Sequence, residues 1–157
     1  MSTFKQEQWL FGEMGRELQI IAQRNAAMQA AHKYTEILVF AEASLVMLAF
    51  EHFLRVLLKD EAQDHHTLPP LLKMALEPDR GLLDPPTGMS IVDTVKLVKE
   101  FRNSLMHGNI QQASTRAGCA TVLEYLAGPF GTETKQVFDI LSALLGQIDP
   151  ETGRRRT

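Results

Sequence analysis

The sequence contains a single cysteine, Cys119, among its 157 residues. One cysteine cannot close a disulfide within the chain or supply the cysteine cluster of a structural zinc site, and this scarcity suits a reducing compartment. We interpret Cys119 as a small core residue. The N-terminal segment, residues 1–15, also lacks the charged start, the apolar run and the cleavage site of a secretory signal, so we expect a cytoplasmic protein.

An excess of charge of either sign is also missing. Sixteen basic and nineteen acidic side chains leave a formal net charge of −3, so no strong overall field draws the protein toward nucleic acid or anionic lipid. Any RNA site must therefore be local. The most apolar stretch, residues 37–50, contains Glu42 and falls short of the roughly 20 apolar residues that a bilayer requires. We therefore expect a buried helix there and no membrane partner.

Several motifs of cofactor-dependent enzymes are absent. The glycines at 81, 88, 128 and 131 match neither the phosphate-binding loop of nucleotide hydrolases nor the dinucleotide-binding fingerprint. His65 and His66 are adjacent in a proline-rich segment, and because adjacent side chains diverge, a solvated loop is favoured over a metal site. We therefore expect no metal and no cofactor.

The patterns that are present are helical. Between residues 4 and 31, apolar residues recur at spacings of three and four, at Leu10, Met14, Leu18, Ile21 and Ala22, which predicts a first helix with one apolar stripe. The segment from 36 to 61 is apolar around most of its circumference, which predicts a buried central helix. Five prolines between 64 and 89 predict a loop with one short helix at 71–76. Ser90, three residues before Asp93, predicts the start of a third long helix that ends at Gly108.

Two shorter helices are predicted at about 114–127 and 132–147, separated by the sequence GPFG. The length suits one domain with its own core. The predicted fold is an all-α, single-domain, mostly antiparallel helical bundle over residues 1–150, in which the third long helix lies beside the central helix. Residues 151–157 are expected to form a disordered basic tail because they are too polar to pack.

The segment FRNSLMHGN, residues 101–109, ends the third long helix. The apolar stripe of that helix is expected at Ile91, Val95, Val98 and Leu105, and Arg102 occupies a position in the same stripe. A buried guanidinium needs an anionic partner. That partner is either a carboxylate of the central helix, Glu42 or Glu51, or the phosphate of a ligand. In a simpler interpretation, Arg102 and His107 are basic residues that stabilise the last turn of a helix through its dipole.

The string RNSLMHG resembles the signature of the HEPN superfamily (higher eukaryotes and prokaryotes nucleotide-binding domain). In that signature an arginine, a polar residue and, a few positions later, a histidine close the third helix. Arg102, Asn103 and His107 match these positions, and the order of elements from about 35 to 110 also agrees. The resemblance implies a helical bundle that forms a homodimer with facing motifs. It also implies a metal-independent endoribonuclease, often a toxin or defence effector, with RNA as substrate and an antitoxin or other protein as partner.

The resemblance assigns the catalytic roles. Arg102 would hold the phosphate while negative charge grows on it, His107 would act as the acid and base, and Asn103 would orient them. In the toxins of this superfamily that act with a nucleotidyltransferase antitoxin, a tyrosine usually follows the histidine by two positions, whereas this chain has Asn109. The alternative function is a non-catalytic HEPN-like module that binds a partner protein or nucleotide and uses Arg102 in a structural ion pair.

Overall fold

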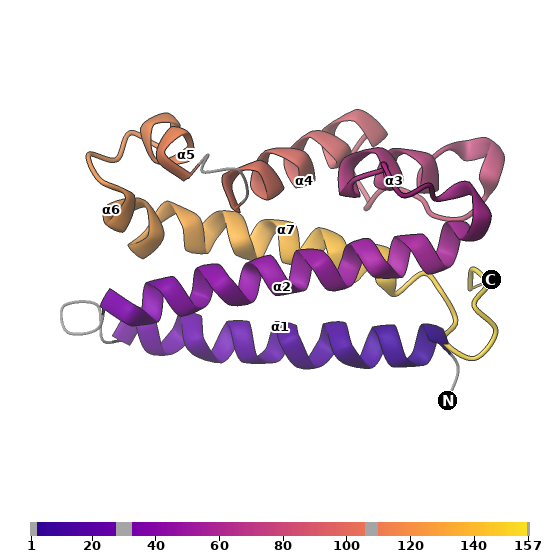
Figure 1. Cartoon of the computed structure of the whole chain (residues 1–157), viewed down its shortest axis with the longest axis horizontal. Helices are drawn as coiled ribbons and strands as arrows, with labels where there is room; N and C mark the ends of the chain where they lie inside the picture. The colour runs from indigo at the N-terminus through magenta and orange to yellow at the C-terminus, as the bar shows by residue number, and fades with distance from the viewer. Residues whose placement is uncertain (1–2, 28–32, 106–109, 157) are drawn as a thin grey trace.

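The fold is a bundle of helices (Figure 1). The computed structural model describes residues 3–27, 33–105 and 110–156, with the backbone alone at 3, 18–19, 21–27 and 33–39. The described residues form seven α-helices: α1 (Thr3–Ala27), α2 (Lys33–Leu58), α3 (Leu68–Ala75), α4 (Ile91–Leu105), α5 (Ile110–Arg116), α6 (Val122–Ala127) and α7 (Pro129–Leu145). Among these residues the β-structure is limited to an isolated bridge between Ile148 and Arg155. The all-α prediction is confirmed.

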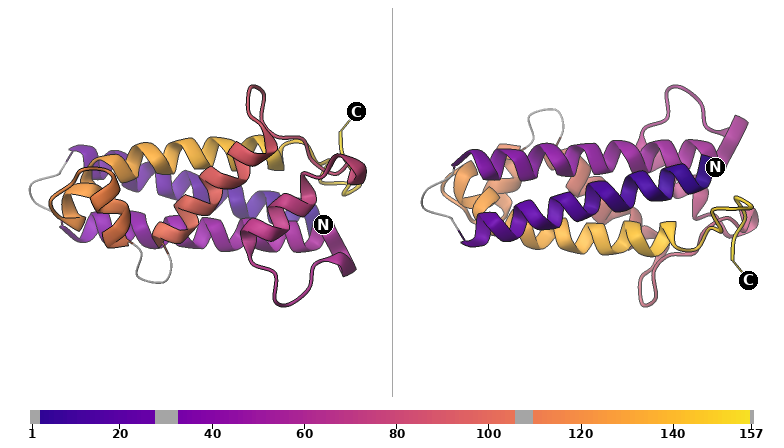
Figure 2. Two further views of the ribbon diagram at one scale, coloured as in Figure 1. Left: turned by 90° about the horizontal axis from the view of Figure 1, so that it is seen from above. Right: turned by 90° about the horizontal axis from the view of Figure 1, so that it is seen from below.

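Three layers are stacked in this bundle. The antiparallel helices α1 and α2 run the length of the molecule, and α7 lies beside α2 (Figure 1). Seen from below, α1 lies over α2 and α7, whereas from above α4 crosses both of them obliquely with α3 and α5 in the same outer layer (Figure 2). Helix α2 is the predicted central helix, and α4 is the predicted third long helix, which we call the motif helix. The predicted contact between them is confirmed, since α4 packs on both α2 and α7.

Aromatic side chains from four helices meet in the core. Phe130 at the start of α7 stacks on Phe101 of α4, with ring centroids 5.7 Å apart, and also contacts Phe40 and Tyr125. Phe130 and Tyr125 are completely buried. The burial of these aromatic rings is a major source of folding free energy.

The N-terminal helix is fixed to both neighbours by polar groups as well. Glu7 approaches His52 of α2, with 3.0 Å between the carboxylate oxygen and the ring nitrogen Nε2. The side-chain amide of Gln8 donates to the backbone carbonyls of Leu145 and Ile148, at 3.2 and 2.8 Å. These contacts join α1 to α2 and to the C-terminal end of α7.

The apolar stripe predicted for the first helix is partly wrong. Leu10 is 39% exposed, whereas Phe11 is buried. The glycine at position 15 explains the shift, because Phe138 of α7 lies where a Cβ atom at Gly15 would stand. Phe138 also stacks on Phe11, with centroids 5.2 Å apart. The missing side chain at Gly15 thus allows α1 and α7 to approach closely.

Substitution of the two α1 glycines should have opposite effects. Gly12→Ala should raise the free energy of unfolding by about 0.5–1 kcal/mol, because alanine is the better helix former and nothing lies within 4 Å of the new methyl group. Gly15→Ala should lower it by about 1–2 kcal/mol through overpacking against Phe138. Urea denaturation followed by circular dichroism measures both. Equal stabilisation by the two alanines would show that α1 and α7 do not make this close contact.

The later helices differ from the predicted boundaries in ways that their caps explain. Ser90 Oγ accepts a hydrogen bond from the backbone N–H of Asp93 at 3.0 Å, which confirms the predicted start of α4. The sequence GPFG was predicted to separate two helices, but Pro129 is the first residue of α7. Proline is favoured at this position because the N–H that it lacks has no partner within a helix. Thr121 and Glu124 cap the separate helix α6.

The C-terminal segment, predicted to be disordered, folds back on the bundle in the described residues. Arg155 forms an ion pair with Asp84, and Arg156 donates from Nε to the carbonyl oxygen of Gly146 at 3.0 Å. The backbone N–H of Arg156 donates to the carbonyl oxygen of Gln147 at 2.7 Å. The polar composition of this segment did not predict its packing, because the contacts are made by backbone groups and by charged side chains that remain at the surface.

Candidate functional site

The motif helix α4 has one buried side. Its buried residues are Thr94, Val98, Phe101, Ser104 and Leu105. The predicted stripe ran through Arg102, but the structure places Phe101 in the core and leaves Arg102 half-buried at the edge of the buried face. The predicted stripe and the observed stripe both have spacings of three and four. The observed stripe buries Phe101, a large apolar side chain that packs on Phe130, in place of Arg102.

Arg102 has no acidic partner among the described residues, in which no ion pair or hydrogen bond involves its guanidinium. Glu42 and Glu51 are half-buried on α2, and neither forms an ion pair with Arg102 in the part of the chain that the structure describes. None of the described carboxylates is therefore the ion-pair partner that was expected for a buried Arg102. Asn103 is half-buried next to it.

Glu51 and Arg55 stand four residues apart on α2, a spacing typical of an ion pair, but no ion pair joins them among the described residues. Arg55 donates instead to the backbone carbonyls of Gln63, at 3.1 Å, and of His66. These bonds hold the loop that follows α2. A backbone carbonyl that would otherwise be unsatisfied is a stronger competitor for a guanidinium than an exposed carboxylate, whose ion pair contributes little.

The third motif residue, His107, lies outside the described residues, together with Met106, Gly108 and Asn109. The predicted end of the motif helix at Gly108 falls in the same segment. The described part of the motif is thus Arg102 and Asn103 in the last turn of α4, which ends at Leu105.

A buried polar cluster that the sequence did not predict lies behind the motif. Ser104 donates to the carbonyl oxygen of Phe101 at 2.6 Å. The hydroxyl group of the buried Tyr125 donates to Glu133 Oε2. Burial raises the pKa of Tyr125, and the hydrogen bond to the Glu133 carboxylate raises it further. Tyr125 therefore stays protonated and serves as a fixed donor. No local pattern indicates this cluster, because its residues come from α4, α6 and α7.

Two hollows flank α4. One, of about 340 Å³, lies between α4, α5 and α7, and is lined by Glu100, Phe101, Arg116 and Glu133 among others. The other, of about 350 Å³, lies between α3 and α4. We call this second hollow the lysine groove. It is lined by Lys73, Ile91, Val92, Val95, Lys96 and Lys99.

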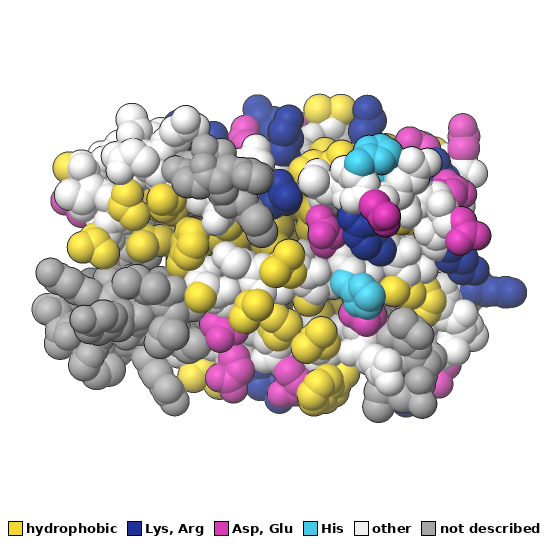
Figure 3. Space-filling view, in the orientation of Figure 1, with side chains coloured by type: hydrophobic (Ala, Val, Ile, Leu, Met, Phe, Trp, Pro, Cys, Tyr) yellow, Lys and Arg dark blue, Asp and Glu magenta, His cyan; other side chains and the backbone are white. Residues whose placement is uncertain are grey.

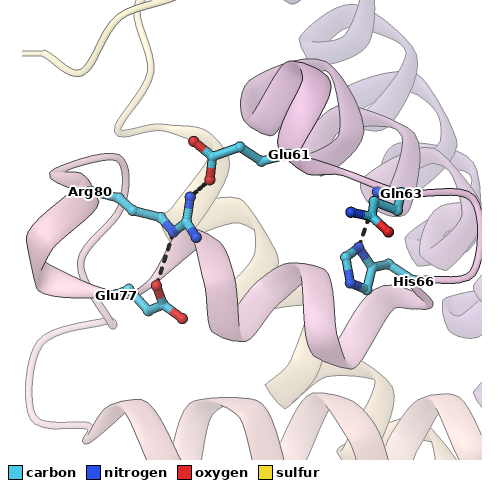
Figure 4. A network of polar contacts seen from close by, with 5 residues as sticks. All are labelled: Glu61, Gln63, His66, Glu77 and Arg80. Atoms are coloured by element: carbon cyan, nitrogen blue, oxygen red, sulfur yellow. Dashed lines mark hydrogen bonds and ion pairs between the residues drawn. The ribbon is translucent and has the colours of Figure 1, made fainter.

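His66 of the proline-rich segment has a structural role. The ring nitrogen Nδ1 of His66 accepts a hydrogen bond from the backbone N–H of Gln63 at 3.0 Å. Nearby, Arg80 lies between the carboxylates of Glu61 and Glu77, and together these contacts order the segment before α4 (Figure 4). In the described part of the chain, no group of three or more histidine, cysteine, aspartate or glutamate side chains is arranged to hold a metal ion.

Comparisons with protein-family models, with curated proteins and with solved structures found no match to this chain. None of the helices, over the residues described, is long and apolar enough to cross a membrane.

Proposed function

We propose that the protein is a metal-independent endoribonuclease of the HEPN type that acts as a homodimer. The observation that carries the proposal is Arg102, a half-buried arginine at the end of α4 with no ion-pair partner among the described carboxylates. Partly desolvated guanidinium groups favour a bidentate anionic partner. A phosphate group of RNA supplies that partner.

The residue types of the motif suit cleavage at a ribonucleotide. Histidine titrates near neutral pH, so His107 can take the proton of the 2′-hydroxyl group and later return a proton to the leaving 5′-oxygen. The 2′-oxygen forms a bond to phosphorus as the bond to the 5′-oxygen breaks, leaving a 2′,3′-cyclic phosphate. Arg102 stabilises the negative charge that develops on the phosphoryl oxygens. Asn103 has an amide side chain that can orient either group.

A second copy of the chain would complete the site, because each copy supplies one arginine and one histidine. The central helix was predicted to be buried around most of its circumference, but Ala41, Leu45, Leu48 and His52 are exposed along one side. Leu45 and Leu48 are 46% and 49% exposed, and hydrophobic side chains are visible over the middle of α2 (Figure 3).

This exposed side of α2 lies on the stretch that supports the motif. Phe101, the residue before Arg102, shares a small apolar cleft with Ala43, Val46 and Met47. In the proposed dimer the second copy covers Leu45 and Leu48, on the same stretch of α2 whose opposite side packs against the motif helix. Contiguous exposed apolar surface of this kind is typical of protein interfaces.

The test is cleavage of single-stranded RNA by the purified protein in EDTA. We expect products that end in a 2′,3′-cyclic phosphate, and we expect a substrate with one 2′-deoxyribonucleotide to resist cleavage at that position, because it lacks the nucleophile. Mass spectrometry of the products measures both. Light scattering should show a dimer at tens of micromolar protein. Cleavage that needs added Mg²⁺, or that proceeds at the 2′-deoxy position, would exclude this mechanism.

A further inference from the structure

The lysine groove joins basic side chains to an apolar floor. Lys73 comes from α3, and Lys96 and Lys99 come from α4, while Val92 and Val95 lie between them. All three lysines are exposed, and the Val92 side chain is 74% exposed. Among the described residues none of the three ammonium groups forms an ion pair with a carboxylate. Three positive charges therefore remain uncompensated at one place on a chain whose net charge is −3.

The groove is continuous with the motif along α4. At about 100° per residue, Lys96, Lys99, Arg102 and Asn103 fall within a sector of about 120° around the helix axis, and the two valines of the floor fall in the same sector. The acidic residues Asp93 and Glu100 lie outside it. Lys99 and Lys96 stand about 4.5 and 9 Å along the axis from Arg102. One side of α4 thus carries a row of cations that leads to Arg102.

We propose that the lysine groove holds the backbone of single-stranded RNA next to the phosphate that Arg102 binds. This inference rests on the proposed function and extends it from the scissile phosphate to the neighbouring nucleotides. Lys96 and Lys99, on flexible four-carbon stems, contact phosphates beside the scissile one, and Lys73 contacts the strand from α3. The exposed Val92 and the half-buried Val95 provide apolar surface for the faces of the bases.

The continuity with Arg102 favours RNA over other anions. An acidic peptide or an anionic lipid would be attracted by the three lysines, but neither would need the row of cations to continue to the motif. A phosphodiester chain is a linear array of charges, so it matches cations that are regularly spaced along a helix. Such contacts do not depend on base sequence, so binding through the groove should be strongly salt-dependent.

The experiment measures binding apart from cleavage. A short fluorescein-labelled oligouridine whose 2′-hydroxyl groups are methylated, and which therefore lacks the nucleophile, is titrated with the protein in EDTA at several salt concentrations, and fluorescence anisotropy gives the Kd. The double variant Lys96→Gln/Lys99→Gln should bind at least about 10-fold more weakly, and the slope of log K against log salt should fall by about 1.4, since each lost phosphate contact on a single strand contributes about 0.7. Lys96→Arg/Lys99→Arg should bind as the unchanged protein does. Lys135→Gln, at an exposed position of α7, is the matched control and should change neither value.

Each outcome separates the groove from the catalytic proposal. Loss of binding in the double glutamine variant supports the groove even if the protein never cleaves RNA. An unchanged Kd and salt slope would overturn the groove, even if the unchanged protein cleaves RNA in EDTA. The groove proposal also fails if the unchanged protein binds a glutamate-rich peptide or phosphatidylserine vesicles more tightly than RNA and loses that binding in the double variant. Thermal melting of each variant verifies that the exposed substitutions leave the fold intact.

Discussion

Replacement of Arg102 by leucine should lower the rate of RNA cleavage in EDTA by about 10²–10³-fold, the usual effect of removing one donor to a developing oxyanion. The same change should leave the fold intact. Arg102 is half-buried at the edge of the apolar face of α4 and pairs with none of the described carboxylates. We therefore expect the free energy of unfolding to change by less than about 0.5 kcal/mol.

Two measurements on Arg102→Leu distinguish the possible roles of the arginine. If Arg102 neutralised Glu42 or Glu51, leucine would leave a half-buried carboxylate without its partner and destabilise the protein by about 1–3 kcal/mol. A strongly destabilised variant would thus favour the non-catalytic module over the nuclease. A stable variant that still cleaves RNA in EDTA would remove the catalytic role of Arg102. His107→Ala, assayed in parallel, should abolish cleavage with little effect on the melting temperature.

The largest loss of stability should come from Phe130→Ala, at about 3–5 kcal/mol. Phe130 is completely buried and contacts the rings of Phe40, Phe101 and Tyr125, from α2, α4 and α6. Alanine would leave a cavity where these helices meet, and neighbours fixed in helices cannot collapse to fill it. Urea denaturation followed by circular dichroism measures the free energy of unfolding.

The matched control for this cavity is Phe130→Leu, which keeps most of the apolar volume and should cost less than about 1.5 kcal/mol. A second comparison is Leu123→Ala, at an exposed position of α6, which should change stability by less than about 0.5 kcal/mol. If Phe130→Ala cost as little as Leu123→Ala, the aromatic cluster would not hold α4 against α7.

The helical content and the start of α4 were predictable because they depend on local sequence. The spacing of apolar residues predicted helices throughout, and the hydroxyl group of Ser90 caps α4 as expected. The predicted break between the last two helices is misplaced because the prediction placed Pro129 in the loop between them. The structure uses Pro129 as the first residue of α7, a distinction that depends on whether the preceding residues continue the helix.

The surroundings of the site were less predictable because they depend on packing between distant segments. Phe101, and not Arg102, lies on the buried face of α4 because it packs on Phe130, which comes nearly thirty residues later in the chain. The bond between Tyr125 and Glu133 and the position of Lys73 beside α4 also require the tertiary fold. The exposed side of α2 was not predictable, because composition does not distinguish an apolar helix that is buried on all sides from one that leaves apolar residues exposed.

The division of α4 into two sides affects how its sequence can change over time. The residues that hold the helix in the core, among them Val98 and Phe101, are different from the residues of its basic side. Substitutions on the basic side can therefore accumulate without loss of the fold, and a descendant could exchange one anionic ligand for another while it keeps the same scaffold. Related chains should thus vary independently on the two sides, with apolar residues retained at 98 and 101 and charge gained or lost together at 96, 99 and 102.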